Sequence, residues 1–336
     1  MREALFIKKN AEKWQEHQHM PTDDPDEQAE RFITILDDLA YSKTFYPQSK
    51  VTRWINGLAA ATYQKIYQNK KEKYSRIGSF WKTELPLVMY NQRRVLYFTF
   101  GLFMLFVGLA VWSSIQNFDF IRGFLPGIVE RTEEGIESGD PFGYYRDSDK
   151  FSMFARIVFN NVLVAFIPFV GGITFGLVTT WNLFSNSVML GVFQYMHFAK
   201  GIGWQSVLVI WIHGAIEIPS FILAAMSGYI IAKGLMFKGT YSWKDSLMRS
   251  MKDGIKLIIA LIPLFLIAGF FESNVTYLSS NAFDNEKNFS LPIWASILIL
   301  VTSLSFMVWY FVIYPLKVGR QHQSLAADPL PQLTTD

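Results

Sequence analysis

Long apolar runs separate a charged N-terminal part of the chain from a hydrophobic remainder. A helix that crosses a membrane needs about 20 largely apolar residues, because the hydrocarbon core is about 30 Å thick. Such runs occupy 95–112, 155–180, 204–232, 255–271 and 291–314, and a shorter run occupies 183–198. The pattern predicts an all-α, polytopic membrane protein with about six transmembrane helices over residues 95–317.

Lysine and arginine flank these runs unevenly. Residues 64–94 carry eight basic side chains and 233–256 carry six, whereas 114–154 has four basic against eight acidic ones. Cytoplasmic loops of membrane proteins are enriched in Lys and Arg. Six spans with N- and C-termini in the cytoplasm and an outer loop at 114–154 satisfy this rule.

The first part of the chain shows apolar residues at the spacing of surface helices. These helices are expected at 2–19, 24–44 and 50–70. In the second of them, Phe32, Ile33, Leu36 and Leu39 share one face. Three such helices are enough for a small cytoplasmic helical bundle over residues 1–77.

Three further segments flank or connect the spans. Residues 78–94 mix aromatic and basic side chains, which is typical of an amphipathic helix at the membrane interface. A second amphipathic helix is expected within the outer loop. Residues 318–336 show no periodicity and are expected to form a disordered tail.

Composition narrows the classes of function. The net charge is +3 and the basic residues cluster beside hydrophobic runs, which argues against nucleic acid and for the lipid bilayer as a partner. The absence of cysteine excludes disulfides and thiolate-based sites. The charged N-terminal sequence lacks the apolar core of a signal peptide, so membrane entry is expected to use the internal segments.

The stretch WIHGAIEIPS at 211–220 places two ionisable side chains inside an apolar run. His213 and Glu217 are four residues apart and therefore share one face of a helix. Glu217 is expected near the bilayer centre, since the run 204–232 has its midpoint close to residue 218. A carboxylate there costs at least about 2.5–3.5 kcal/mol on insertion scales, so polar partners are expected around it.

The expected depth of other polar residues ranks them as partners. Glu272 ends its span in the outer half, and Asn160 and Asn161 open theirs from the outside. Asn186 starts its span on the inner side and is a weaker candidate. We therefore predict a ligand-binding cluster of His213, Glu217, Glu272, Asn160 and Asn161, with Asn186 at its margin, reached from the outer side.

Three roles remain open for this cluster. It fixes helix register as a buried hydrogen-bond network, it forms a transport or lipid-headgroup site, or it binds a divalent metal through His213, Glu217 and Glu272. The chain has no HExxH pattern and no further general base at this place, so an enzyme is not favoured. No catalytic residue is assigned, and no cofactor is expected apart from such a metal.

Two glycines in the second run are spaced for close helix packing. Gly172 and Gly176 form a GxxxG pattern, which lets another backbone approach closely. We expect this contact to lie inside the molecule rather than between two copies of the chain.

Several stretches together resemble a known family. NNVLVAFIPFVGGITFG, LFSNSVMLG and HGAIEIPSFILAAMSGYIIA follow one another in the chain and resemble the signatures of the stage II sporulation protein M family of bacterial membrane proteins. REALFIKKNAEKW and DDLAYSKTFYPQSKVTRWIN resemble the version of that family in non-sporulating bacteria. The resemblance covers roughly residues 2–318.

This resemblance implies a multi-pass protein of the bacterial inner (cytoplasmic) membrane with no established catalytic activity. In spore formers the family member anchors peptidoglycan-degrading partners. That sporulation role is not carried over, because the long N-terminal cytoplasmic bundle indicates a different set of partners; membrane or cell-wall-associated protein partners are expected. The family's intramembrane polar residues would fall on Asn161, Asn186, His213, Glu217 and Glu272. Ser187 departs from the family pattern, which has glycine there.

The sequence thus favours an inner-membrane scaffold or assembly protein whose polar cluster binds a lipid headgroup or a small ligand. A transporter or ion-linked carrier is the main alternative, and an intramembrane metal-dependent enzyme is the second.

Overall fold

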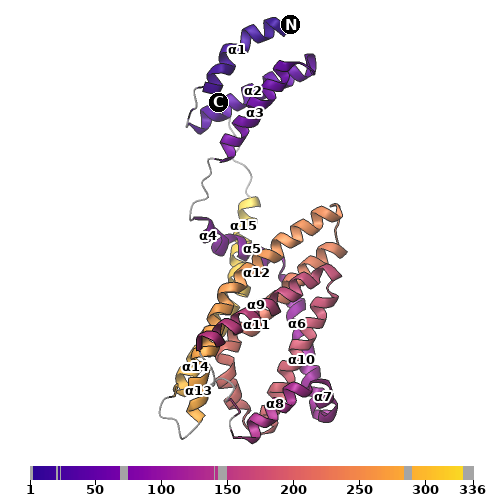
Figure 1. Ribbon diagram of the computed structural model, residues 1–336, viewed down its shortest axis with the longest axis vertical. Helices are drawn as coiled ribbons and strands as arrows, with labels where there is room; N and C mark the ends of the chain where they lie inside the picture. Colours follow the sequence, from indigo (N-terminus) through magenta and orange to yellow (C-terminus); the bar gives the residue numbers. More distant parts are fainter. Residues whose placement is uncertain are drawn as a thin grey trace. The chain divides into compact units, whose positions relative to one another are not determined.

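The computed structural model describes residues 3–19, 22, 24–68, 75–139, 141–142, 150–283 and 290–327, and the regular elements among them are all helices (Figure 1). This confirms the predicted all-α class. The chain divides into two compact units, Met1–Ser79 and Phe80–Asp336. They are called the N-terminal unit and the membrane unit below.

The N-terminal unit contains three helices at the predicted places: α1 (Glu3–His19), α2 (Pro25–Phe45) and α3 (Lys50–Gln68). They share a small buried core made of Phe6, Trp14, Ile35, Leu39, Ile55 and Ala59. The Trp14 indole Nε1–H donates a hydrogen bond to the Asp38 carboxylate at 2.8 Å, which joins α1 to α2.

The predicted buried face of α2 is corrected by the structure. Ile35, Leu39 and Ser42 are buried, whereas Ile33 and Leu36 are 59% and 41% exposed. The buried residues follow the i, i+4, i+7 spacing of a single stripe, which is the side that α1 and α3 contact. Helix α2 carries apolar residues along two stripes, so the sequence alone does not decide which stripe is buried.

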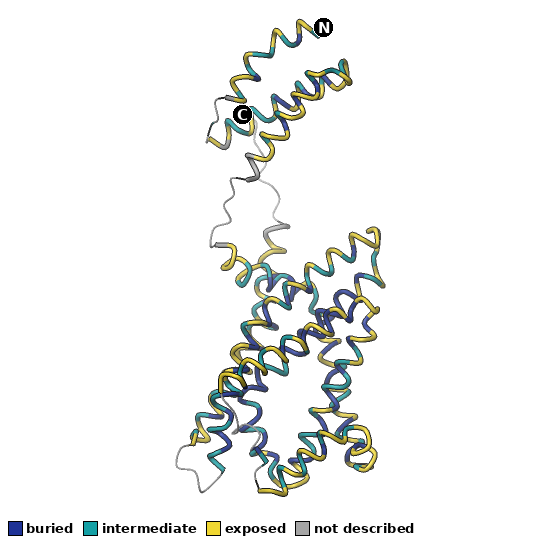
Figure 2. Tube along the Cα trace, in the orientation of Figure 1, coloured by how far each residue is buried: buried dark blue, intermediate teal, exposed yellow. Residues whose placement is uncertain are grey.

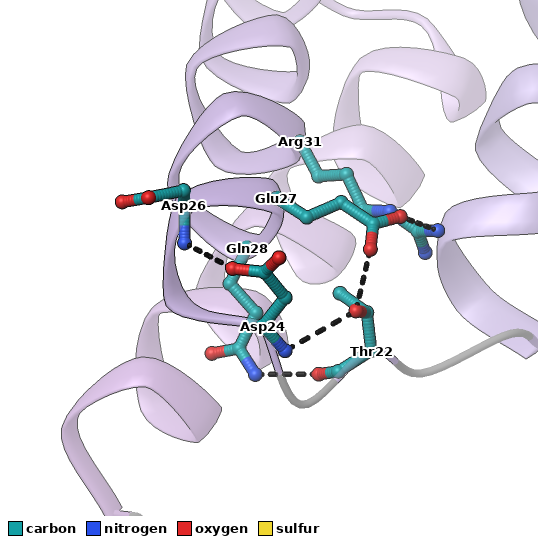
Figure 3. A network of polar contacts seen from close by, with 6 residues as sticks. All are labelled: Thr22, Asp24, Asp26, Glu27, Gln28 and Arg31. Atoms are coloured by element: carbon teal, nitrogen blue, oxygen red, sulfur yellow. Dashed lines mark hydrogen bonds and ion pairs between the residues drawn. The ribbon is translucent and has the colours of Figure 1, made fainter.

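Polar contacts fix the start of α2 (Figure 3). The Asp24 carboxylate accepts a hydrogen bond from the Asp26 amide at 2.9 Å, as expected of an N-cap residue. The Glu27 carboxylate accepts from the Thr22 hydroxyl at 2.6 Å and from the Arg31 guanidinium at 2.5 Å. These two hydrogen bonds hold the pKa of Glu27 below its ordinary value, and the one from Thr22 has the larger effect.

The membrane unit is built on six long helical segments. They are α6 (Arg93–Gln116), α9 (Lys150–Gly171), α10 (Leu177–Ala199), α11 (Gly203–Met236), α12 (Trp243–Asn274) and α14 (Ile293–Val308), which continues through the π-turn η5 (Trp309–Ile313) into α15 (Tyr314–Ala327). Among the described residues, five segments are long and apolar enough to cross a membrane, and α10 is not one of them. The predicted count of six depends on α10, which has 23 residues but carries Asn182, Asn186 and Gln194.

The central helix of the membrane unit is α11. In its most apolar stretch 67% of the residues are buried, compared with 17% in α6 and in the α14–α15 segment. It packs against α6, α9, α10, α12 and α14. Figure 2 shows the long buried stretch that results. Its polar residues therefore lie on the helix with the least surface left for lipid.

The predicted span 155–180 ends earlier than expected. After α9, the short η3 helix (Gly172–Thr174) is followed by Phe175 and Gly176, which have left-handed φ angles of 55° and 84°. This tight turn reverses the chain, and residues 177–180 belong to α10. The GxxxG pattern therefore lies at a turn rather than on one helix.

The expected close approach of two backbones still occurs. It involves Gly172 at the turn and Gly228 of α11 rather than a pair of glycines on one helical face. A Cβ atom placed on Gly172 would overlap the carbonyl oxygen of Gly228 in α11, and one placed on Gly228 would overlap that of Pro168 in α9. The Thr179 hydroxyl donates to the same Pro168 carbonyl at 2.7 Å. The turn between α9 and α10 is thus packed directly against the α11 backbone.

Residues 78–94 do not form the peripheral helix that the sequence predicts. They fold into the end of α4 (Ser75–Ser79), the π-turn η1 (Phe80–Glu84), α5 (Leu85–Asn91) and the first turn of α6. The side chains of Leu85, Val88 and Met89 are buried, and α5 packs against α15. These apolar residues, together with the partly buried Phe80 and Trp81, therefore pack against the core of the membrane unit.

The C-terminal segment is also more ordered than predicted. Helix α15 continues to Ala327, where a disordered tail was expected from residue 318. The Tyr90 hydroxyl donates to the Gln323 side-chain carbonyl at 3.0 Å, and Gly319 allows the Tyr90 ring to lie against the α15 backbone. Pairing with α5 provides this order. Residues 328–336 lie outside the described part of the chain.

The loop 114–154 contains two short helices in place of the single one expected. Helices α7 (Phe118–Phe124) and α8 (Pro126–Glu137) are separated at Leu125, because Pro126 disfavours helical backbone in the residue before it. Ile121 and Val129 pack with Val188 and Val192 of α10. Helix α8 therefore lies over one end of the bundle, called the α8 end below.

Candidate functional site

A cavity of about 270 Å³ lies between α6, α8, α9, α10, α11 and α12. Its walls are mostly apolar, with Phe103, Ile128, Met189, Phe193 and Phe265 among the lining residues. The polar side chains that line it are Asn161, Asn186, His213 and Glu217. An apolar cavity with a few convergent polar groups is typical of a small-molecule site. Ile128 comes from α8, so the cavity lies toward the α8 end.

Three ionisable side chains converge beside this cavity. His213, Glu217 and Glu272 each offer one nitrogen or oxygen atom, and these three atoms lie within 4.8 Å of one another. The first two are one turn apart on α11, and Glu272 stands near the end of α12, which packs along α11. The i, i+4 spacing on one helix and the pairing with its neighbour together create the group.

The orientation of the His213 ring follows from its hydrogen bond to Thr276. The ring is 5% exposed, and its Nδ1 lies 3.0 Å from the Thr276 hydroxyl oxygen. That hydroxyl donates its single proton to the Phe271 carbonyl at 3.1 Å, so it accepts from Nδ1–H. The neutral ring then carries its lone pair on Nε2. Thr276 thereby selects the tautomer of His213.

The carboxylates of Glu217 and Glu272 have few partners: one positive charge and one amide lie near them. Glu217 and Glu272 interact electrostatically with each other, and Arg156 of α9 interacts with Glu272. The amide of Asn161 lies beside Glu217. Its Nδ2 is fully buried and has no hydrogen-bond partner of normal geometry among the described residues. A ligand oxygen at this place would satisfy it.

The two neighbouring asparagines of α9 behave differently. Asn161 is 7% exposed and lines the cavity, whereas Asn160 is exposed and is not part of the lining. Adjacent residues on a helix point about 100° apart, so one of the pair turns inward and the other turns away. The structure therefore does not bring Asn160 to the predicted cluster.

Asn186 lies at the cavity, although the sequence places it at the start of a span. Helix α10 begins at Leu177, so Asn186 is nine positions into the helix, or about 14 Å along its axis. Its side-chain amide donates to the Asn182 carbonyl at 2.9 Å. The earlier start of α10 brings Asn186 to the depth of the cavity.

Two residues of the site were missed from the sequence. Thr276 lies outside the apolar run, but it follows Glu272 by four positions, the spacing of one helical face. Arg156 is the one basic residue inside the run 155–180, and it marks the α8 end of α9. Each of the two is a single polar residue at or just beyond the edge of an apolar segment.

The donor set is suited to metal binding as well as to hydrogen bonding. One imidazole nitrogen and two carboxylates are ligand types that zinc accepts in three-ligand sites with an open position. Within the described part of the chain, this is the one group of His, Asp or Glu close enough to hold a metal ion.

Comparison with known families identifies the membrane unit. The family model described as Stage II sporulation protein M matches residues 96–277, which is 182 of the 336 residues. The chain belongs to the stage II sporulation protein M family. The family match includes His213, Glu217, Glu272 and Thr276, so the whole site lies within it. A second model, described as a domain of unknown function (DUF8413), matches residues 4–68 and thus α1–α3.

Curated relatives of this stage II sporulation protein M family member include two proteins of Methanocaldococcus jannaschii. The uncharacterized protein MJ0706 is 27% identical over 134 residues, which cover 39% of this chain and 59% of that protein. The uncharacterized protein MJ0793 is 28% identical over 159 residues, which cover 47% and 89% respectively. The chain thus spans less than two thirds of the first relative. No solved structure matches the chain.

Proposed function

We propose that this protein is a multi-pass inner-membrane scaffold or assembly protein whose membrane unit binds a small ligand with a polar head group. The observation that carries the proposal is the cavity of about 270 Å³, which is apolar except where His213, Glu217, Asn161 and Asn186 converge. The apolar walls suit an acyl or other hydrophobic body, and the polar end suits its head group.

The distribution of charge supports the orientation of this scaffold. Basic residues gather at the end of the membrane unit opposite α8, where Lys233 near the end of α11, Lys238 in the connection and Arg249 early in α12 follow one another. The segment 118–137 at the α8 end carries two basic and five acidic residues. With α10 as the sixth span, the positive-inside rule places both termini in the cytoplasm and the cavity in the outer half of the bilayer.

The division of the chain supports an assembly role. The N-terminal unit has its own core and its own family model, separate from that of the membrane unit. A separate folded unit on the same chain as a membrane domain suits the recruitment of membrane-associated protein partners. No reaction is needed to account for the cavity, because its polar groups are sufficient for binding.

The ligand is tested by native mass spectrometry of the protein extracted with its surrounding lipid. A leucine at Gly214 points its side chain into the cavity, where an added Cβ meets only Ile218 at 3.5 Å. A leucine at Gly108 of α6 is the matched control, since nothing lies within 4 Å of that position. We expect a bound small molecule in the parent and in Gly108→Leu, and its loss in Gly214→Leu. Equal retention in all three proteins would contradict the proposal.

A further inference from the structure

We infer that His213, Glu217 and Glu272 bind one divalent transition-metal ion of the zinc type, with an open coordination position toward the cavity. This inference deepens the proposed ligand-binding function and rests on it for the role of the open position. In this arrangement the metal ion at the polar end of the cavity binds the head group of the ligand.

The donor atoms are close enough to surround one ion. Ligand atoms on a tetrahedral zinc ion lie about 3.4 Å apart, as follows from bond lengths of about 2.1 Å. The three atoms here lie within 4.8 Å of one another. Each glutamate has rotatable side-chain bonds through which the remaining gap would close on an ion.

The balance of charge favours a divalent ion. Two carboxylates in an apolar bundle repel each other and are costly to bury without compensation. Arg156 offers a single positive charge near Glu272. A doubly charged cation between Glu217 and Glu272 offsets the repulsion between the two carboxylates, and the neutral imidazole of His213 adds no charge.

The hydrogen bond from His213 to Thr276 has the form of an outer-sphere contact in metal sites. Metal-binding histidines usually donate their second ring N–H to an oxygen, which fixes the tautomer and aims the other nitrogen at the metal. Here Nδ1 lies 3.0 Å from the Thr276 hydroxyl, whose own proton goes to the Phe271 carbonyl, so Nδ1–H is the donor. The lone pair is therefore on Nε2, the atom that would ligate.

An independent observation indicates a ligand oxygen at the open position. Asn161 is 7% exposed, lies beside Glu217 and lines the cavity. Its buried Nδ2 has no hydrogen-bond partner of normal geometry among the described residues, although the Glu217 carboxylate lies beside it. Water or a head-group oxygen on the metal would accept this hydrogen bond. The imidazole nitrogen argues against calcium and magnesium, which prefer shells made of oxygen.

The test is metal content after chelation and reloading with zinc alone. The full-length protein is purified with a chelator, incubated with zinc, freed of excess ion and analysed by elemental mass spectrometry. We expect one zinc ion per chain in the parent, and less than a tenth of that in His213→Ala and Glu217→Gln. The controls His322→Ala and Glu130→Gln alter exposed residues and should bind as the parent does.

A further variant keeps the test informative if His213→Ala or Glu217→Gln fails to fold. Thr276→Val removes the outer-sphere oxygen and keeps the side-chain volume, so zinc affinity should fall about 10–100-fold while thermal unfolding shows a folded protein. Parent-like affinity in Thr276→Val, or a parent that binds no zinc, would overturn the metal site. If the zinc-free parent still retains the cavity ligand, only the metal inference fails; if zinc binds and no ligand is retained, only the proposed function fails.

Discussion

Gly228 of α11 lies so close to Pro168 of α9 that no side chain fits between them. A Cβ atom on Gly228 would overlap the Pro168 carbonyl oxygen, and the Thr179 hydroxyl would also be too near. The same carbonyl accepts the hydrogen bond from Thr179. The contact is between backbones, so neighbouring side chains cannot relieve an added methyl group by changing rotamer.

Gly228→Ala is therefore expected to destabilise the membrane unit. Overpacking typically costs about 1–3 kcal/mol, and a backbone contact places this variant at the upper end of that range. Thermal unfolding in detergent measures the loss. Gly108→Ala on α6 is the matched control, because nothing lies within 4 Å of its Cβ, and it should be neutral or slightly stabilising. Equal unfolding temperatures for the two variants would argue against the close approach.

The pairing of α15 with α5 predicts how far the C-terminus can be shortened. A chain ending at Ala327 keeps Gly319 and Gln323 and should unfold at the parent temperature. A chain ending at Lys317 loses the contact of Gly319 and Gln323 with the buried Tyr90 side chain and should unfold at a lower temperature. Indistinguishable unfolding of the two shortened chains would contradict a structural role for α15.

The absence of cysteine permits a direct test of orientation. Ser138→Cys at the end of α8 and Ser324→Cys in α15 each introduce a single exposed thiol. In intact cells a membrane-impermeant maleimide should label the first variant, and it should label the second only after lysis. The reverse pattern would place both termini and the cavity on the other sides of the membrane.

Substitution of Glu217 should separate loss of charge from loss of hydrogen bonding. Glu217→Gln keeps an acceptor and adds a donor beside Asn161, whereas Glu217→Ala leaves its buried partners unpaired. An unsatisfied buried polar group costs about 1–3 kcal/mol, so the alanine variant should be less stable than the glutamine variant by this amount. Chemical or thermal unfolding of the metal-free proteins measures the difference. Equal stability of the two variants would mean that Glu217 makes no hydrogen bond in the folded protein.

The N-terminal unit should lose stability in mild acid through His17. Partial burial, followed by the charges of Arg31 and Lys13, lowers the pKa of His17 below 6.5 in the folded chain. The unfolded chain then binds the proton more readily, so stability is full above pH 6.5 and is lost as pH falls through the folded pKa. Hydrogen exchange of α1 amides, corrected for intrinsic rates, should accelerate in acid in the parent more than in His17→Gln. An equal response of the two proteins would exclude His17 as the cause.

Much of the membrane unit could be predicted from the sequence because lipid imposes a simple requirement. Segments exposed to acyl chains must be apolar over about 20 residues, and α6, α9, α11, α12 and α14 satisfy this requirement. Helix α10 shows where the rule weakens. It is shielded by α6, α9 and α11 and can carry Asn182 and Asn186, so its start at Leu177 was not evident.

The site was predicted in part for a related reason. His213 and Glu217 were found because a charged pair inside an apolar run on one helical face has few alternatives to an inward position. The choice between Asn160 and Asn161 depends on the rotation of α9, and the role of Thr276 depends on how the chain continues after α12. Both are set by packing between helices, which periodicity in one segment does not contain.

The contact between α5 and α15 means that the first and last helices of the membrane unit meet. The hydrogen bond between Tyr90 and Gln323 joins positions 233 residues apart in the chain. A circularly permuted membrane unit, linked between these helices and opened at the exposed connection after Gly239, would keep every helix neighbour in place. The order in which the helices are synthesised would change, while the enclosure of the cavity would not.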